Sequence, residues 1–417
     1  MIFLVISISV ERTSLPPKMS EPEKDSSAIA EEQSLTDVDD AWKFLDKHRD
    51  AVPSSSTSTS SSQEGILLAI RRKNDWRIVP LGFLCYTMQF MDKLVLNYAG
   101  VMSMRADLRL TGNDFSNLVT ATYIATAVWE LPTVWLLQRF PVAKYMAINV
   151  ILWGISTACG AAAKDYSTMM VTRVLLGIFE ATINPSLMLI VGRWYTKPEQ
   201  APRLSLWLQG LGVGQIVGGA LSYGFQFVSP ENGGLAGWRI LFITLGVATV
   251  VIGIATYLFL PDNPMEAPWL DDGEKVALLK HISVNQTGVE NKKFRSAEIW
   301  EALRDPQVWL IWASVVLFAG TGGIVVAYSA TLIRNLGYDP KQATLLNMPS
   351  GLISITVMAV PAWAIRRGQP RWAWALAVLL PAYVFFFFPF HFPYIHLSSL
   401  FFLLTFSCLS FLFFFLY

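Results

Sequence analysis

Two charged residues, Arg173 and Glu180, lie seven residues apart in an otherwise apolar stretch that runs from Ser167 to Val191. Seven residues make almost two helical turns, so both side chains would lie on one helix face, about 10 Å apart along the axis. Charges at bilayer depth cost at least about 2.5 kcal/mol each and usually face a bundle interior or a water-filled cavity. An arginine there suits an anionic substrate, and a buried carboxyl group suits proton carriage.

A second pair, Asp92 and Lys93, interrupts the first long apolar segment. Neighbouring residues on a helix point about 100° apart, so these two side chains cannot both face one partner. We expect Lys93 to pair with Glu180, which leaves Asp92 as a second protonatable carboxylate. Two intramembrane charge pairs in one chain indicate a transporter. The alternative is that these residues pair only to lock the helix bundle, although such a lock is costly and replaceable.

Within this apolar stretch, polar residues recur at helical spacing beyond Glu180. Arg173, Gly177, Glu180 and Asn184 recur at intervals of four, three and four residues, which predicts a polar stripe on one helix face. Gly177 would allow a neighbouring helix to approach closely. Asn184 is therefore a candidate contact for the substrate.

Further along, Gly210, Gly214 and Gly218 have a strict four-residue spacing. This spacing is typical of a face used for close helix packing, and we assign these glycines to packing. Gln209 beside them is a candidate hydrogen-bond partner of a substrate. Tyr328 follows a glycine-rich part of a later apolar segment, where a broken helix would line a cavity; plain packing is the alternative there.

Composition excludes several other functions. The 417 residues are 53% hydrophobic and only 15% charged, against about 25% charged residues in typical soluble domains. The net charge of +1 does not favour nucleic-acid binding. The four histidines lack metal-ligand spacing, and no phosphate loop, nucleophile elbow or dinucleotide motif occurs. We therefore expect no enzyme, no metal and no cofactor.

The apolar segments are long enough to span a bilayer, which needs about 20 residues. Basic residues in the short connections between them place the N-terminus in the cytoplasm. The expected organisation has five parts: a disordered cytoplasmic tail at 1–70, a six-helix half at 71–261, a cytoplasmic linker at 262–305, a partial second half at 306–384, and a phenylalanine-rich tail at 385–417. Spans are expected at about 78–103, 115–138, 143–163, 167–191, 204–228, 239–261, 307–333, 342–365 and 372–390. Residues 1–18 are expected to be translated from upstream of a start at Met19.

Several motifs, in order, resemble a known family. Arg173-Val-Leu-Leu-Gly-Ile-Phe-Glu-Ala181, followed by Pro185 and Arg193-Trp-Tyr195, resembles the fourth-helix signature of the anion:cation symporter family within the major facilitator superfamily. Met91-Asp-Lys93 with Asn97-Tyr-Ala99 resembles its first-helix motif, and Leu137-Gln-Arg-Phe-Pro141 with Lys144 resembles its loop between helices 2 and 3. Gly237-Trp-Arg-Ile-Leu-Phe242 and Leu260-Pro-Asp-Asn-Pro264, with Trp269-Leu270, are similar to the fungal allantoate permease branch.

The resemblance covers about residues 71–380. It implies an all-α membrane protein with the major facilitator fold of six plus six transmembrane helices. It also implies alternating access and proton-coupled uptake of organic anions. In that scheme Asp92 and Glu180 are proton-linked carboxylates, and Arg173 is the substrate or coupling cation.

The end of the chain departs from the family pattern. Residues 385–417 hold 13 of the 26 phenylalanines and contain no glycine or alanine, although helix-bundle interfaces are rich in small residues. Most residues there can be written with pyrimidine-only codons, which is typical of translation through an unspliced intron. We expect this segment to be non-native, so that the fold stops after about nine or ten helices.

The sequence thus predicts a proton-coupled symporter for a small organic anion, such as allantoate or a carboxylate vitamin. Arg173, Asn184, Gln209 and Tyr328 are the expected substrate contacts, and Asp92, Lys93 and Glu180 the proton-coupling residues. The expected partners are the anion, the proton as coupling ion and the bilayer of a fungal plasma membrane, with the protein a monomer. A transporter-like nutrient sensor and a non-functional truncated gene product are the alternatives.

Overall fold

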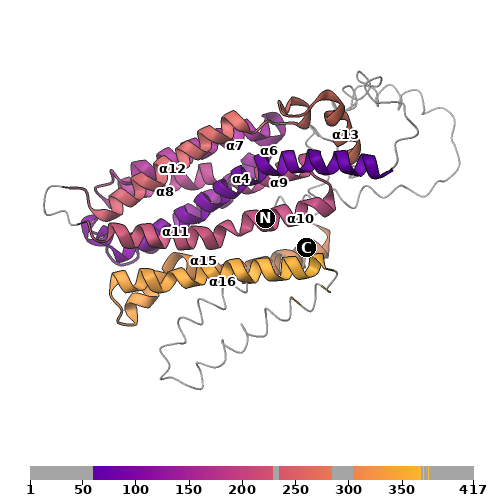
Figure 1. Cartoon of the computed structure of the whole chain (residues 1–417). Coiled ribbons are helices and arrows are strands. Elements are labelled where there is room, and N and C mark those ends of the chain that lie inside the picture. The colour runs from indigo at the N-terminus through magenta and orange to yellow at the C-terminus, as the bar shows by residue number, and fades with distance from the viewer. Residues whose placement is uncertain (1–59, 229–233, 284–303, 368–369, 371–373, 375–417) are drawn as a thin grey trace.

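A computed structural model of the chain describes residues 60–228, 234–283, 304–367, 370 and 374. Every regular element in these ranges is helical (Figure 1). The elements are α4 (Ser60–Val101), α5 (Met104–Asp107), α6 (Asp114–Arg139), α7 (Val142–Gly160), α8 (Tyr166–Glu180), α9 (Ile183–Trp194), α10 (Lys197–Leu208), α11 (Gly210–Phe225), α12 (Gly237–Phe259), the 3₁₀ turn η3 (Pro264–Glu266), α13 (Asp272–Ile282), α15 (Pro306–Asn335) and α16 (Pro340–Arg366). The predicted ninth span and both predicted non-native segments lie outside or almost wholly outside the described residues.

The first eight predicted spans coincide with these helices, but two of them are broken. The fourth consists of α8 and α9, which are separated by a turn at Ala181 and Thr182. Pro185 lies in the first turn of α9, where its missing N–H is tolerated. The fifth consists of α10 and α11, which meet at Gln209 just before a glycine-rich run. Five helical segments of the described chain are long and apolar enough to cross a membrane: Val142–Gly160, Tyr166–Trp194, Lys197–Phe225, Gly237–Phe259 and Pro340–Val360.

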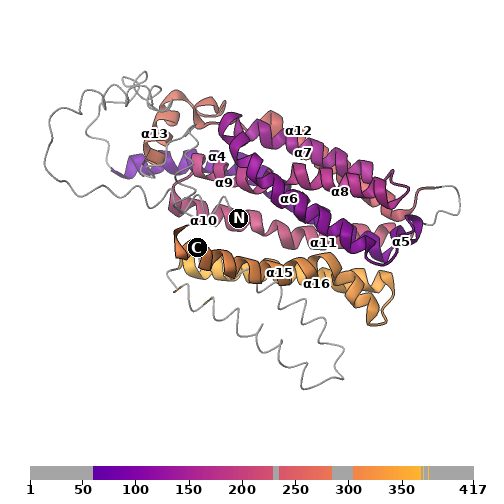
Figure 2. The ribbon, with the colours of Figure 1, turned by 180° about the vertical axis from the view of Figure 1, so that it is seen from behind.

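The helices form two groups. α4 to α12 make the six-helix half, and α15 and α16 form a layer that runs along α10 and α11 in both views (Figures 1 and 2). α11 packs on α16, and α15 packs on α4. The first and fifth spans of the six-helix half therefore form its boundary with the second half.

The glycines of α11 make this close packing possible. A Cβ on Gly210 would lie 2.6 Å from the hydroxyl oxygen of Thr87, and one on Gly214 would lie 3.1 Å from the Thr87 carbonyl oxygen. Gly218 lies further along the same face, where a Cβ would be 3.6 Å from the Tyr98 ring. The structure thus places the three glycines against α4, as small residues at four-residue spacing favour.

The first helix begins earlier than the sequence predicted. α4 starts at Ser60, whereas the prediction assigned residues up to 70 to a disordered tail and began the span near 78. Partners from later in the chain explain the added turns: Lys73 pairs with Glu274 of α13 at 2.7 Å, and Arg71 pairs with Glu199 of α10. The basic segment before the first span is thereby part of the folded bundle.

The predicted linker is also partly folded. Asp262 is buried, and its carboxylate accepts hydrogen bonds from the backbone N–H groups of Ala143, at 2.7 Å, and Lys144, at 3.3 Å. Trp269 stacks on Trp194, with ring centroids 5.8 Å apart. Residues 262–283 therefore belong to the six-helix half. We call the end of the bundle where they pack, and where α4 begins, the linker end, and the opposite end the far end.

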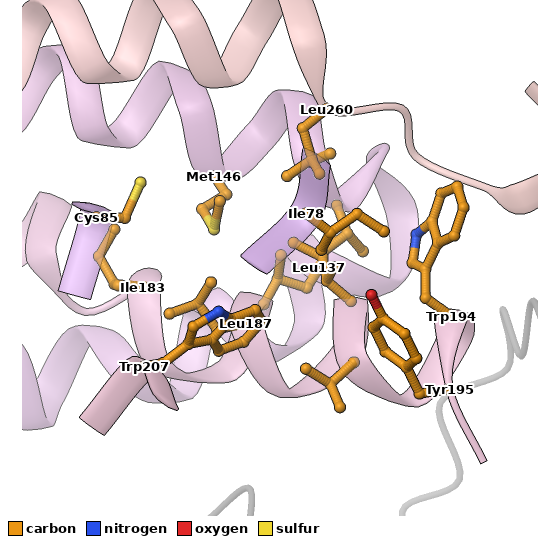
Figure 3. Packing of buried hydrophobic residues seen from close by; sticks show 14 of the residues in the cluster. Ile78, Cys85, Leu137, Met146, Ile183, Leu187, Trp194, Tyr195, Trp207 and Leu260 are labelled. Atoms are coloured by element: carbon orange, nitrogen blue, oxygen red, sulfur yellow. The ribbon is translucent and has the colours of Figure 1, made fainter. Parts of the chain in front are cut away.

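A large apolar cluster occupies the linker end, where α4, α6, α7, α9 and α10 converge on the linker segment. Figure 3 shows its core residues interlocking: Ile78, Cys85, Leu137, Met146, Ile183, Leu187, Trp194, Tyr195, Trp207 and Leu260. Trp207 also donates its indole N–H to the Val79 carbonyl, at 3.0 Å. This cluster fixes α4 and α9 relative to one another, and these two helices flank the charged residues described below.

We predict that Asp262→Ala lowers the stability of the six-helix half by about 1 kcal/mol, because Asp262 caps the first turn of α7. The measurement is the thermal unfolding midpoint of the purified protein in detergent. Asp272→Ala is the matched control: Asp272 is exposed and pairs with Lys275 within one helix, so its loss should change little. Equal midpoints for both variants would show that the cap does not stabilise the fold.

Candidate functional site

The buried face of α8 carries the two charges of the fourth span, Arg173 and Glu180. The helix begins after Asp165, whose carboxylate accepts a hydrogen bond from the Thr168 N–H at 2.9 Å. Arg173, Gly177 and Glu180 lie on its buried face. Gly177 allows α6 to approach so closely that a Cβ there would lie 2.5 Å from the Thr122 carbonyl oxygen. Arg173 and Glu180 therefore point into the six-helix half.

Glu180 pairs with Lys93 of α4. The ammonium nitrogen of Lys93 lies 3.0 Å from a carboxylate oxygen of Glu180. The Glu180 side chain is 1% exposed, whereas the Lys93 side chain is 30% exposed. The structure thus brings together the two residues that the sequence argument paired, and only the cation of the pair is accessible.

Asp92 and Arg173 form the second half of the cluster. Asp92 accepts a hydrogen bond from the Thr157 hydroxyl at 2.9 Å, and it is close enough to Arg173 for the two charges to interact. The guanidinium carbon of Arg173 lies 5.0 Å from the centroid of the Phe242 ring. Both charged residues are buried, with Arg173 only 2% exposed. We call Asp92, Lys93, Arg173 and Glu180 the charge cluster.

The charge cluster is not fully hydrogen-bonded. In the part of the chain that the structure describes, two guanidinium nitrogens of Arg173 are buried and have no hydrogen-bond partner. A buried polar atom without a partner costs about 1–3 kcal/mol, and more when it is charged. A purely structural lock would satisfy these atoms, because a half-satisfied buried network is worse than an apolar core. The unpaired atoms favour a site whose ionisation or occupancy changes.

The other predicted substrate contacts lie on other helices than α4 and α8. Asn184 is exposed on α9, so it does not continue the buried stripe; the break at Ala181 and Thr182 interrupts the helical spacing on which that prediction relied. Gln209 is half-buried at the junction of α10 and α11. Tyr328 is at the far end, where its hydroxyl donates to the Ser116 hydroxyl at 2.8 Å.

Sequence reasoning missed several neighbours of the charge cluster, among them Trp153 beside Asp92. Tyr86 and Tyr123 interact electrostatically with Lys93, and Thr157 and Phe242 contact Asp92 and Arg173. Tyr86 was detectable, because it precedes Lys93 by seven residues and so shares its helix face. The others come from different helices, and one sequence alone does not show which faces meet.

The family model of the Major Facilitator Superfamily matches residues 82–417, and so extends through the phenylalanine-rich segment. The chain is 36% identical over 301 residues to the thiamine pathway transporter THI73 of Saccharomyces cerevisiae, covering 72% of this chain and 56% of that protein. It is 32% identical over 318 residues to the allantoate permease of the same yeast, covering 74% and 58%. The chain thus spans a little over half the length of these relatives.

Solved structures agree on the fold. The partially occluded inward-open xylose transporter XylE from E. coli superimposes with a TM-score of 0.59 at 16% identity, covering 80% of this chain and 84% of that one. An inward-facing bacterial homologue of the human lysosomal transporter Spinster gives 0.58 at 18% identity, covering 81% and 73%. The predicted family and the all-α major facilitator fold are confirmed: this chain, with its charge cluster buried between the first and fourth spans, belongs to the major facilitator superfamily of integral membrane proteins.

Proposed function

We propose that the protein is a symporter that couples proton movement to uptake of a small organic anion by alternating access. In this proposal it works as a monomer in a fungal plasma membrane, with its N-terminus in the cytoplasm and the proton as the coupling ion. The observation that carries the proposal is the charge cluster, which holds two carboxylates and two cations in the interior of the six-helix half.

Charge balance explains how such a cluster would couple movement of the proton to movement of the anion. With Asp92 and Glu180 ionised, the two acids offset Lys93 and Arg173. A proton on Glu180 removes the partner of Lys93 and leaves one uncompensated cation in a medium of low dielectric. A substrate anion restores the balance. Anion and proton therefore stabilise one another in the site, which is the requirement for symport.

Exposure distinguishes the two cations. The Lys93 side chain is 30% exposed, whereas Arg173 is 2% exposed and is covered by Phe242. We therefore propose that the anion binds at Lys93 in this conformation. Arg173 compensates the charge of Asp92 deeper in the bundle. Tyr86 and Tyr123, which interact with Lys93, offer hydroxyl groups to the anion.

This arrangement suits a carboxylate, because the ammonium group would exchange one carboxylate partner, Glu180, for another. The allantoate permease among the relatives favours allantoate as the first compound to test. Nicotinate, pantothenate and sugar acids share the same charged group.

We predict uncoupler-sensitive accumulation of at least one carboxylate. Cells that express the protein from its mature transcript are given labelled allantoate, nicotinate, pantothenate or a sugar acid, with and without a proton uncoupler. Accumulation should rise as external pH falls. Uptake that changes neither with external pH nor with the uncoupler would contradict proton coupling. Normal membrane expression without uptake of any compound would favour the sensor or the non-functional product.

We predict that Glu180→Gln abolishes accumulation but preserves exchange of preloaded substrate. The amide mimics the protonated carboxyl group, so Lys93 stays free for the anion while no proton is released. The measurements are counterflow and uphill uptake in vesicles. Glu266→Gln, at an exposed glutamate of η3, is the matched control. Uphill uptake by Glu180→Gln at the wild-type level would exclude this residue from coupling.

We predict that Lys93→Gln raises the KM for the anion about tenfold to a hundredfold, since a hydrogen bond to a charged group contributes about 1.5–3 kcal/mol. Lys164→Gln, at an exposed lysine between α7 and α8, should leave KM unchanged. The double variant Lys93→Gln with Glu180→Gln removes both charges together and controls for folding. An unchanged KM in Lys93→Gln, with a raised KM in Arg173→Lys, would move the anion to Arg173.

A further inference from the structure

A buried asparagine of α16 joins the two halves of the molecule. The Asn347 side-chain amide donates to the Tyr98 hydroxyl of α4 at 3.2 Å and to the Ser329 hydroxyl of α15 at 3.0 Å. Its side-chain oxygen accepts from the Gln215 amide of α11 at 3.2 Å. Asn347 is fully buried. One side chain therefore connects α4 and α11 of the six-helix half with α15 and α16 of the second.

Further hydrogen bonds extend this connection. Asn97 donates to the Ser329 hydroxyl at 2.8 Å and to the Val326 carbonyl at 3.1 Å, and Gln215 donates to the Ser350 hydroxyl. We call this set the interface latch: Asn97, Tyr98, Gln215, Ser329, Asn347 and Ser350. All six residues are at most 8% exposed.

The interface latch lies towards the far end of the boundary between the halves. Asn97 and Tyr98 are in the last turns of α4, and Asn347 is in the second turn of α16. The Gln226 amide also bonds the Thr344 hydroxyl there, at 2.9 Å. Towards the linker end, α10 and α11 meet α16 through small and apolar residues: Gly212 lies against Gly351, and Leu208 and Leu211 pack on Met358.

These two kinds of contact behave differently when the halves move. Apolar contacts are non-directional and tolerate small displacements. Hydrogen bonds weaken steeply with misalignment, and each buried group that loses its partner is penalised. The polar set therefore favours two discrete arrangements, joined or separated. One acceptor, the Asn97 side-chain oxygen, is buried without a partner, so the set is not optimised for maximum stability.

We propose that the interface latch is the gate that holds the far end closed, with Asn347 as the residue that positions both halves against each other. The inference rests on the alternating-access cycle of the proposed function. α4 links the gate to the charge cluster, because Asn97 follows Lys93 by four residues, about one helical turn. A shift of α4 when the charge cluster exchanges proton and anion would reach the hydrogen bonds of Asn97 and Tyr98 directly.

The test measures opening of the far end without any substrate. Ala330 of α15 is fully buried, and α15 packs on α4 of the six-helix half, so a cysteine there reports on separation of the halves. Ala330→Cys is introduced into the protein without its native cysteines, and cells are treated with a membrane-impermeant maleimide. We expect Asn347→Ala to speed labelling about tenfold, as loss of one to two net hydrogen bonds would, and Tyr98→Phe to speed it less.

Thr249→Val is the matched control, because the Thr249 hydroxyl is buried and bonds the Leu245 carbonyl of its own helix. It should leave the labelling rate unchanged. Equal rates in all variants, or a similar increase in Thr249→Val, would overturn the gate. If Asn347→Ala does not reach the membrane, Tyr98→Phe, which removes a single hydroxyl, decides the matter. Labelling needs no anion, so a protein that fails every uptake test can still confirm or refute the gate.

Discussion

The ion pair between Lys93 and Glu180 is the interaction on which the arrangement of the six-helix half depends. In a bilayer, an isolated charge is costly wherever it faces lipid, so α8 has to lie within reach of the long Lys93 side chain of α4. Asp92 then points to a neighbouring part of the bundle, where the Thr157 hydroxyl of α7 donates a hydrogen bond to it and Arg173 of α8 interacts with its charge. Because these charges face the interior, the outer faces of the helices can be apolar.

Much of the fold could be predicted from the sequence because the bilayer imposes a length. Eight apolar segments matched helices, and the pairing of Lys93 with Glu180 followed from the need of each charge for a partner. The prediction for Asn184 was wrong in its geometry, since regular spacing does not extend across the break that follows Glu180. The early start of α4 was missed because Glu199 and Glu274, which hold its basic turns, lie more than a hundred residues away.

The interface latch also could not be predicted, because its partners are far apart in the chain. Gln215 and Asn347 are 132 residues apart in the chain, and each looks like an ordinary polar residue in an apolar span. The structure shows that both lie at the boundary between the halves, where they are hydrogen-bonded to each other. The allantoate-permease-like segment from Leu260 to Leu270 acquires a role in the same way, because Asp262 caps α7 and Trp269 stacks on Trp194. Motifs that mark a family by sequence thus include residues that hold the bundle together.

The unequal chemistry of the two ends of the interface also has a thermal consequence. Hydrogen bonds of the far end are enthalpic contacts that loosen on heating, whereas burial of Leu208, Leu211 and Met358 away from water gains strength on warming from low temperature. Both kinds of contact are formed together here, so warming should loosen the far end before the linker end separates. The two halves would then hinge apart about their apolar contacts as temperature rises, rather than separate along the whole interface at once.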